Sequence, residues 1–322
     1  MVRGFIFMMI FHTIESIFSI VLMIMTGYFF TNKGWFDEQA SKLFSRIINN
    51  IALPFYMIWN LMSTFNKDGL LHLATGLLVP FSSMFACYIV SYAVSKILKV
   101  KPNRQGTFRS MFFVSNTIFI GLPVNLALFG EQSVPYVLLY YIANTSLFWT
   151  IGASGIRNDG AVGQGKTSVL EVAKKIFSPP LLGFLLAIAL VLGDISLPRF
   201  ILDTCKYLGN MTTPLSMLFI GIAIYGIKLK DIKLSKDMIA ILLGRFFISP
   251  CLVMVITHFM PLPLLMRKVF IIQAMLPVMT QTAIIAKAYQ ADAEYAAVMT
   301  TVTTVLAIFV IPVYMLIFQY YF

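Results

Sequence analysis

The stretch SNTIFIGLPVNLALFG, from Ser115 to Gly130, lies in a long apolar segment and yet contains several residues that weaken a helix. Pro123 lacks a backbone donor and clashes with the preceding helical turn, and Gly121 loosens the helix. Asn116 brings polar groups that are costly to bury without hydrogen-bond partners. Gathered near the middle of one apolar segment, these residues predict a broken helix.

The composition of the whole chain is that of a protein embedded in a membrane. Of its 322 residues 59% are hydrophobic and 11% are charged, and the mean hydropathy is +0.86. A soluble domain of this length could not bury so much apolar surface, and the apolar segments are close to the roughly 20 residues that a helix needs to cross a bilayer. The sequence therefore predicts an all-α polytopic membrane protein. Ten transmembrane helices are expected, at residues 8–30, 43–62, 70–97, 108–129, 133–156, 169–192, 205–227, 238–258, 266–289 and 294–320.

The distribution of basic residues predicts the orientation of these helices. Of the 24 Lys and Arg residues, 17 lie in or beside the connections that follow the odd-numbered helices, and 6 lie in the other connections and the termini. Because cytoplasmic loops carry an excess of Lys and Arg, we expect the first set in the cytoplasm and both chain ends outside it. The formal charge of +11 is then a topology signal of a multi-pass protein of the cell (cytoplasmic) membrane, and no nucleic-acid partner is expected.

The two halves of the chain resemble each other. Each half holds five predicted helices, and because five is odd, the second half enters the membrane from the opposite side. Two residue pairs recur at an offset of 160 positions, namely Asn50 with Asn210 and Pro54 with Pro214. The sequence thus predicts an inverted repeat of five plus five helices. Its parts are a first repeat, a Gly-rich cytoplasmic linker and an inverted second repeat, at residues 1–156, 157–168 and 169–322.

A second broken helix is expected in the ninth segment. The stretch QAMLPVMTQTA, from Gln273 to Ala283, places Pro277 near the middle of that segment, at nearly the same offset from the first break. Transporters built from inverted repeats bind substrate near the bilayer midplane, between broken helices of the two repeats. Helix N-termini at such breaks carry partial positive charge and free N–H groups, which suit an anion. The alternative is a pair of ordinary proline kinks, which are common in membrane helices.

Over nearly its whole length the sequence resembles the auxin efflux carrier family, in particular its bacterial malate and malonate permeases. The resemblance is carried jointly by KGWFDEQASKLFSRIINNIALPFYMIW (33–59), by the stretch from Ser115 to Gly130 and by LPVMTQTAIIAKAYQADAEYAA (276–297). It implies ten helices in a 5+5 inverted repeat, crossed and proline-broken helices 4 and 9, and separate scaffold and transport domains. The implied fold is similar to that of sodium–proton antiporters and bile-acid symporters.

The sequence also departs from the plant members of that family. Their fourth helix has an Asn-Pro-Asn motif, whereas this chain has Asn116 followed by Gly121-Leu122-Pro123, and it lacks their long central cytoplasmic loop. Auxin is therefore disfavoured as a substrate. The resemblance favours a small carboxylate instead, with malate first.

Candidate substrate-binding residues are the polar and helix-breaking residues near the predicted breaks, and three others deeper in the repeats. They are Asn116, Thr117, Gly121, Pro123, Pro277, Thr280, Gln281, Thr282, Asn50, Asn210 and Arg245. Amides and hydroxyls could donate to a carboxylate, or they could bond neighbouring helices to each other. Arg245 lies inside an apolar segment, where a charge is costly and usually functional. It could pair with a bound dicarboxylate, support the structure, or extend to the cytoplasmic face.

These observations predict a secondary active transporter, a permease, for a small organic anion such as malate or a related dicarboxylate. It would work by alternating access around the helix 4/9 crossover. Coupling to protons or to sodium and assembly as a homodimer are left open by the sequence. The predicted helices contain no acidic metal cluster, HExxH pair or Ser/His arrangement, so no enzymatic activity, metal or other cofactor is expected. The alternatives are a carrier or channel for another carboxylate or an auxin-like anion, and, as the least favoured, an integral-membrane enzyme.

Overall fold

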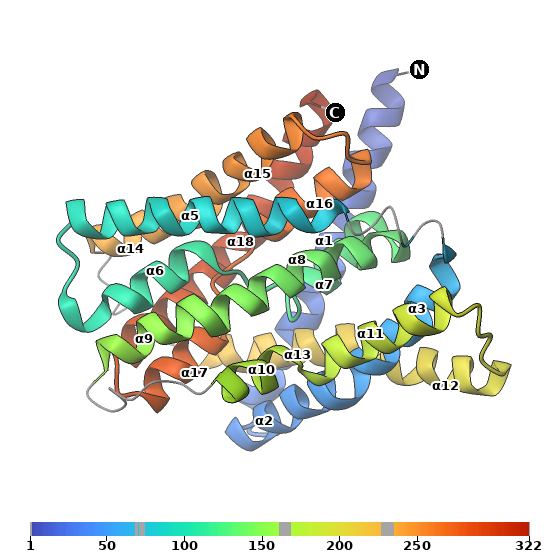
Figure 1. The fold of residues 1–322 in the computed structure, drawn as a ribbon, viewed down its shortest axis with the longest axis horizontal. Coiled ribbons are helices and arrows are strands. Elements are labelled where there is room, and N and C mark those ends of the chain that lie inside the picture. The colour runs from blue at the N-terminus through green and yellow to red at the C-terminus, as the bar shows by residue number, and fades with distance from the viewer. Residues whose placement is uncertain (1, 68–69, 71–74, 161–168, 227–234, 322) are drawn as a thin grey trace. The chain divides into compact units, whose positions relative to one another are not determined.

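The computed structural model describes residues 2–67, 70, 75–160, 169–226 and 235–321, and its helices fall on the predicted apolar segments (Figure 1). Within these residues no strand forms, and the extended backbone pairs at one isolated antiparallel bridge between Ser115 and Val278. The all-α prediction is confirmed for this part of the chain. The number of spans and the inverted repeat remain predictions, and most of the predicted linker, 161–168, lies outside the described residues.

The chain divides into two compact units, and each combines segments from both halves of the sequence. The first unit consists of Met1–Thr75, Leu122–Tyr136 and Ile176–Ile227. The second unit consists of Gly76–Gly121, Val137–Lys175 and Lys228–Phe322. These units are defined by contacts, whereas the predicted repeats are defined by sequence similarity, so the two divisions describe different properties of the chain.

Close helix packing at small residues holds the first unit together. Its helices are α1 (Val2–Asn32), α2 (Glu38–Ile47), α3 (Leu53–Thr64), α7 (Gly121–Phe129, from its second residue on), α11 (Pro179–Leu192), α12 (Arg199–Gly209) and α13 (Thr212–Tyr225). A Cβ on Gly27 of α1 would lie 2.5 Å from the carbonyl oxygen of Leu218, and one on Gly221 of α13 would lie 2.3 Å from that of Ile24. Such backbone contact is the packing mode of membrane helices, in which small residues let two helices approach.

The second unit contains the remaining long helices and the bridge between Ser115 and Val278. Its helices are α5 (Leu78–Ile97), α6 (Gln105–Phe113), α8 (Val134–Leu147, from Val137 on), α9 (Ala153–Asp159), α10 (Val169–Ile176), α14 (Lys236–Leu243), α15 (Ser249–His258), α16 (Leu264–Ala274), α17 (Gln281–Ala288) and α18 (Ala293–Tyr321). Two π-helical turns continue this unit's helices, at Phe148–Gly152 between α8 and α9 and at Gly244–Ile248 between α14 and α15.

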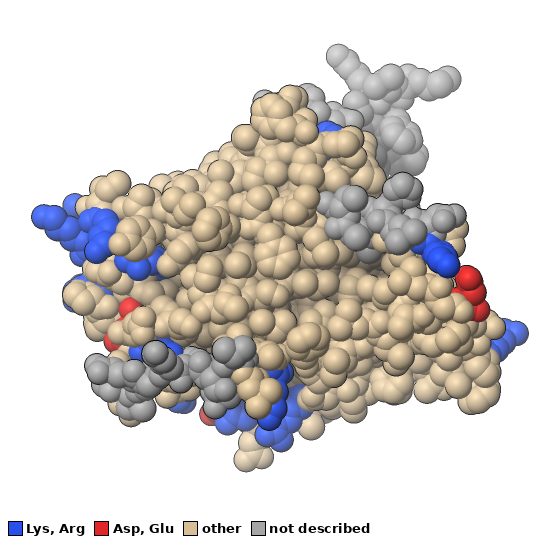
Figure 2. Space-filling model, in the orientation of Figure 1, with Lys and Arg blue, Asp and Glu red and all other residues tan. Residues whose placement is uncertain are grey.

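Several helical stretches have the length and apolarity needed to cross a membrane. Among the described residues they are Leu78–Ile97, Arg199–Tyr225, Lys236–His258 and Ala293–Phe318, with shorter apolar helices at Phe18–Asn32 and Pro179–Leu192. Large apolar side chains are exposed on these helices, such as Leu182 (52% exposed) and Phe309 (68% exposed). Uncharged side chains cover most of the face drawn in Figure 2. This surface suits contact with lipid, as the composition predicts.

The packing of α6 against α9 gives a first testable prediction. A Cβ on Gly106 would lie 2.0 Å from the carbonyl oxygen of Gly155, which is backbone and cannot turn aside. We expect Gly106→Ala to destabilise the protein by about 2 kcal/mol, a usual cost of overpacking a core. Gly226→Ala is the control, because its Cβ would meet its nearest neighbour at 3.7 Å. Thermal unfolding of the purified protein in detergent measures both variants, and equal melting temperatures for the two would contradict the prediction.

Candidate functional site

Both predicted breaks are present, and their backbones pair with each other. In the fourth segment α6 ends at Phe113 and α7 begins at Gly121, and in the ninth α16 ends at Ala274 and α17 begins at Gln281. We call the two non-helical segments, 114–120 and 275–280, the paired breaks. Pro277, the proline of the second break, disfavours helical conformation at the residue before it, which contributes to the interruption there.

Asn116 joins the paired breaks by backbone and by side chain. Its N–H donates to the carbonyl of Pro277 at 2.9 Å, and its Nδ2 donates to Oγ1 of Thr280 at 3.0 Å. Its Oδ1 accepts from the N–H of Phe119 at 3.2 Å. One amide side chain thereby satisfies polar groups on both segments, which a bilayer could not solvate. Asn116 is 4% exposed, so it lies inside the second unit.

Each break is also anchored by a polar side chain of a neighbouring long helix. Asn144 of α8 accepts from the N–H of Ser115 at 2.9 Å and donates to its carbonyl at 3.0 Å. Thr303 of α18 accepts from the N–H of Val278 at 3.1 Å. The two anchors are 159 positions apart in the sequence, and the residues that they hold are 163 apart. This correspondence agrees with the offset that suggested an inverted repeat.

Gln273 is a buried residue of the site that the sequence did not single out. Its Nε2 donates to the carbonyl of Thr117 at 3.4 Å, and its Oε1 has no partner among the described residues. A Cβ on Gly121 would lie 2.6 Å from that oxygen and 2.5 Å from Cδ1 of Leu276. Gly121 therefore packs closely against the ends of these two side chains. The sequence feature that could have identified Gln273 was a polar side chain within an apolar segment.

The other candidates on the paired breaks differ in burial. Thr117 is 2% exposed and Thr282 is fully buried, while Thr280 and Gln281 are half-buried. The hydroxyl of Thr282 has no hydrogen-bond partner in the described part of the chain, and neither do those of Ser115 and Thr145. Buried polar atoms are rarely left unsatisfied in native proteins. These oxygens and Oε1 of Gln273 therefore have unused hydrogen-bonding capacity.

Arg245 is fully buried and bonds only backbone carbonyls. From the π-helical turn after α14, its Nε and Nη2 donate to Leu276 at 3.0 and 2.8 Å, and Nη2 also donates to Ala274 at 2.6 Å. Nη1 donates to the carbonyl of Phe112 at 3.4 Å. None of the described ion pairs involves Arg245. The side chain therefore does not extend to the cytoplasmic face, and it joins the carboxyl ends of α6 and α16.

Three candidates belong to the first unit. Pro123 lies on α7 and is buried. Asn50 is exposed and its Nδ2 donates to the carbonyl of Arg46, one turn back in its own helix, at 2.9 Å. Asn210 is exposed at the end of α12. The paired breaks bring the second-unit candidates together, whereas a role in binding for these three remains a prediction.

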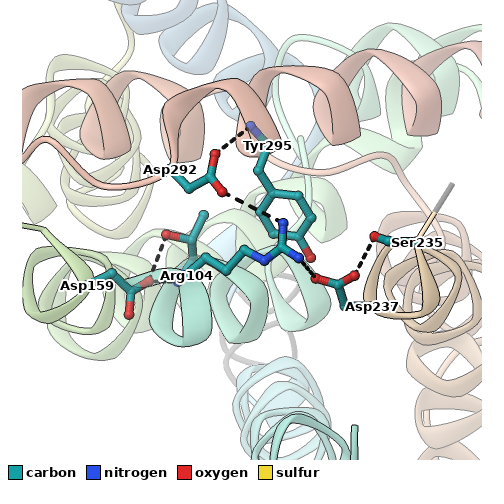
Figure 3. Close-up of polar contacts among 7 residues, drawn as sticks. Arg104, Asp159, Ser235, Asp237, Asp292 and Tyr295 are labelled. Carbon is teal, nitrogen blue, oxygen red and sulfur yellow. Dashed lines mark hydrogen bonds and ion pairs between the residues drawn. The ribbon is translucent and has the colours of Figure 1, made fainter. Parts of the chain in front are cut away.

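Charged groups of the second unit gather instead around Arg104, at the ends of its helices (Figure 3). Nη2 of Arg104 lies 2.9 Å from Oδ2 of Asp237, Nη1 lies 3.7 Å from Oδ2 of Asp292, and the guanidinium stands 4.5 Å from the ring centroid of Tyr295. None of these residues was among the predicted site residues. We call these four residues the Arg104 cluster.

Asp159 binds the amino-terminal end of α6 beside the Arg104 cluster. Its carboxylate accepts from the N–H groups of Gly106 at 2.8 Å and of Thr107 at 2.6 Å. Burial raises the pKa of this carboxyl above its usual range, and the hydrogen bonds oppose that shift only in part. A carboxylate at this position complements the partial positive charge of a helix N-terminus. The paired breaks have no such carboxylate among the bonds described for them.

Comparison with known proteins agrees with this architecture. A family model described as "Membrane transport protein" matches residues 12–315. An uncharacterised transporter of Methanocaldococcus jannaschii is 25% identical over 305 residues, which cover 93% of this chain and 97% of the relative. An uncharacterised transporter of Methanothermobacter thermautotrophicus is 22% identical over 304 residues, covering 93% and 96%. The chain belongs to the membrane transport protein family.

Proposed function

We propose that this protein is a secondary carrier for a small organic anion, which binds at the paired breaks and crosses the membrane by alternating access. One observation carries the proposal: two broken helices meet through Asn116, next to buried oxygen atoms that have no partner among the described residues. Irregular backbone at membrane depth is tolerated where it is buried in protein or lines a cavity, and carriers use such breaks to hold substrate.

The chemistry of the paired breaks suits an anion. Asn116 and Thr280 offer an amide and a hydroxyl, and Gln281 begins α17, whose first turn has N–H groups without a helical partner. No acidic residue lies in that first turn. Hydrogen bonds from neutral donors to a carboxylate are stronger than those between neutral groups. Malate, or a related dicarboxylate, is the first substrate to test, and this choice rests on the sequence resemblance to malate and malonate permeases.

Uptake of labelled L-malate by proteoliposomes tests the proposal. We expect saturable uptake that is accelerated by unlabelled malate trapped inside, because a carrier that returns loaded with malate reorients faster than an empty one. Asn116→Ala should lower that exchange by about tenfold or more, since a hydrogen bond to a charged group contributes about 1.5–3 kcal/mol. Asn158→Ala is the control, because Asn158 is exposed at the end of α9.

The same assay separates the alternatives. A channel would give flux without acceleration by internal malate. An enzyme would convert the label into a new compound, which chromatography of the vesicle contents detects. An imposed pH gradient or sodium gradient reports the coupling ion. If folded protein shows no uptake above that of empty liposomes, malate is excluded as a substrate. A panel of other monocarboxylates and dicarboxylates would then test whether the protein is a carrier.

A further inference from the structure

We propose that Arg245 sets the charge selectivity of the site. Its guanidinium neutralises the partial negative charges at the carboxyl ends of α6 and α16, so the partial positive charge at the amino end of α17 is left uncompensated. The proposal rests on the proposed function, since it explains why the carried solute would be an anion. Arg245 acts here as a positioning residue, because every hydrogen bond described for it goes to a backbone carbonyl.

The first step concerns the carbonyl groups that Arg245 binds. The last carbonyls of a helix have no helical partner, and the carboxyl end carries roughly half a negative charge. Phe112 lies in the last turn of α6, while Ala274 and Leu276 lie at and just beyond the end of α16. Arg245 bonds all three carbonyls. Two such ends together carry about one negative charge, which one guanidinium balances.

The second step concerns the cost of burying Arg245. A buried charge is strongly unfavourable unless partners replace its hydration. The ionisable groups described next to it are Tyr140 and Cys87, and neither is a carboxylic acid. The carbonyl ends of the helices are therefore what stabilises the guanidinium. Gly244 permits this approach, because a Cβ there would lie 2.5 Å from the ring of Phe112.

The third step concerns the amino ends of two helices of the second unit, α17 and α6. The amino end of α17 has no side-chain cap and no acidic residue in its first turn. Thr282, in that turn, is fully buried and its hydroxyl has no partner among the described residues. By contrast, the carboxylate of Asp159 accepts from the first N–H groups of α6 and so compensates the partial positive charge at the amino end of that helix. The uncompensated end of α17 therefore attracts negative charge, and the unsatisfied hydroxyl marks where a ligand would bond.

Two variants separate the charge of Arg245 from its shape. Arg245→Lys keeps the positive charge with fewer and differently placed donors, while Arg245→Met removes the charge at similar bulk. Each is compared with wild type by inhibition of labelled malate exchange, using unlabelled malate and its uncharged diamide, malamide. The ratio of the two inhibition constants reports charge selectivity independently of the transport rate.

We expect Arg245→Lys to keep the wild-type preference for malate over malamide within about threefold, while its transport rate falls. We expect Arg245→Met to reduce that preference by about tenfold or more, because an uncompensated charge acts strongly at low dielectric. An unchanged ratio in folded Arg245→Met would overturn the proposal. A tenfold loss of the preference for malate over malamide in Arg245→Lys would overturn the proposal as well. If Arg245→Met does not fold, the result for Arg245→Lys alone tests the proposal.

Amide hydrogen exchange tests the first step without any substrate. Loss of Arg245 should speed exchange at residues 114–120 and 275–280 together, with a smaller effect in Arg245→Lys, because the carbonyl ends of both helices lose their common partner. Unchanged exchange at both segments would overturn the neutralising role. Wild-type protein that exchanges no malate but shows this pattern would contradict the proposed substrate and leave the role of Arg245 supported, so the two failures are distinguishable.

Discussion

Replacing Arg104 by Met is expected to destabilise the second unit by about 3 kcal/mol, because removing one partner of a buried ion pair leaves the other charge uncompensated. The side chain of Asp237 is 9% exposed and that of Arg104 is 18% exposed, so water compensates little for the loss. The cluster also joins the start of α6 to α14 and to the loop before α18, as Figure 3 shows. The expected result is a lower free energy of unfolding, measured by titration with SDS in mixed micelles.

A double-mutant cycle distinguishes the ion pair from general packing. Asp237→Asn removes the buried negative charge, so Arg104→Met with Asp237→Asn should be less destabilised than Arg104→Met alone. Arg104→Lys should lie between wild type and Arg104→Met, since it keeps the charge and loses the planar group above the ring of Tyr295. Additive effects of the two single variants, or a change below about 0.5 kcal/mol in Arg104→Met, would contradict a coupled buried pair.

The sequence was most informative where a residue constrains its own backbone. Pro277 disfavours a regular helix around itself, because it lacks a backbone donor and clashes with the preceding turn, and Gly121 loosens a helix because it lacks a side chain. These effects depend only on the residue itself and its neighbours in the sequence, so the apolar segments and the two breaks could be predicted without coordinates. Asn116 was identified on the same ground, because an amide in an apolar segment requires partners.

The partners of each polar residue could not be predicted, because they depend on residues far apart in the chain. Arg245 could be identified as a charge inside an apolar segment, but an arginine can bond a substrate carboxylate or a backbone carbonyl, and the carbonyls that it bonds are 29 to 133 positions away. Gln273 and the Arg104 cluster were missed for the same reason. The bonds of Asn144 to the backbone of a break could not be predicted for the same reason.

Removing the amide of Asn144 should therefore damage the site more than its position on a long helix suggests. Asn144→Leu leaves the N–H of Ser115 unsatisfied inside the second unit, while the carbonyl of Ser115 still accepts from the N–H of Thr117 at 3.0 Å. A buried orphan group costs about 1–3 kcal/mol, so we expect a loss of about 2 kcal/mol in the free energy of unfolding. Malate exchange should fall with it, because the segment that carries Asn116 loses its anchor.

Thr303 provides the matched comparison, since it bonds a single backbone group of the other break. Thr303→Val should cost about as much as Asn144→Leu, because each variant leaves one buried backbone N–H without its partner. Asn144→Asp keeps an acceptor for the N–H of Ser115 and loses the donor, so its stability should lie between wild type and Asn144→Leu. Thr145→Val is the control on the neighbouring residue, whose hydroxyl has no described partner. If Asn144→Leu is no less stable than Thr145→Val, Asn144 does not hold the break, and the extended backbone at Ser115 must be maintained by its pairing with the second break alone.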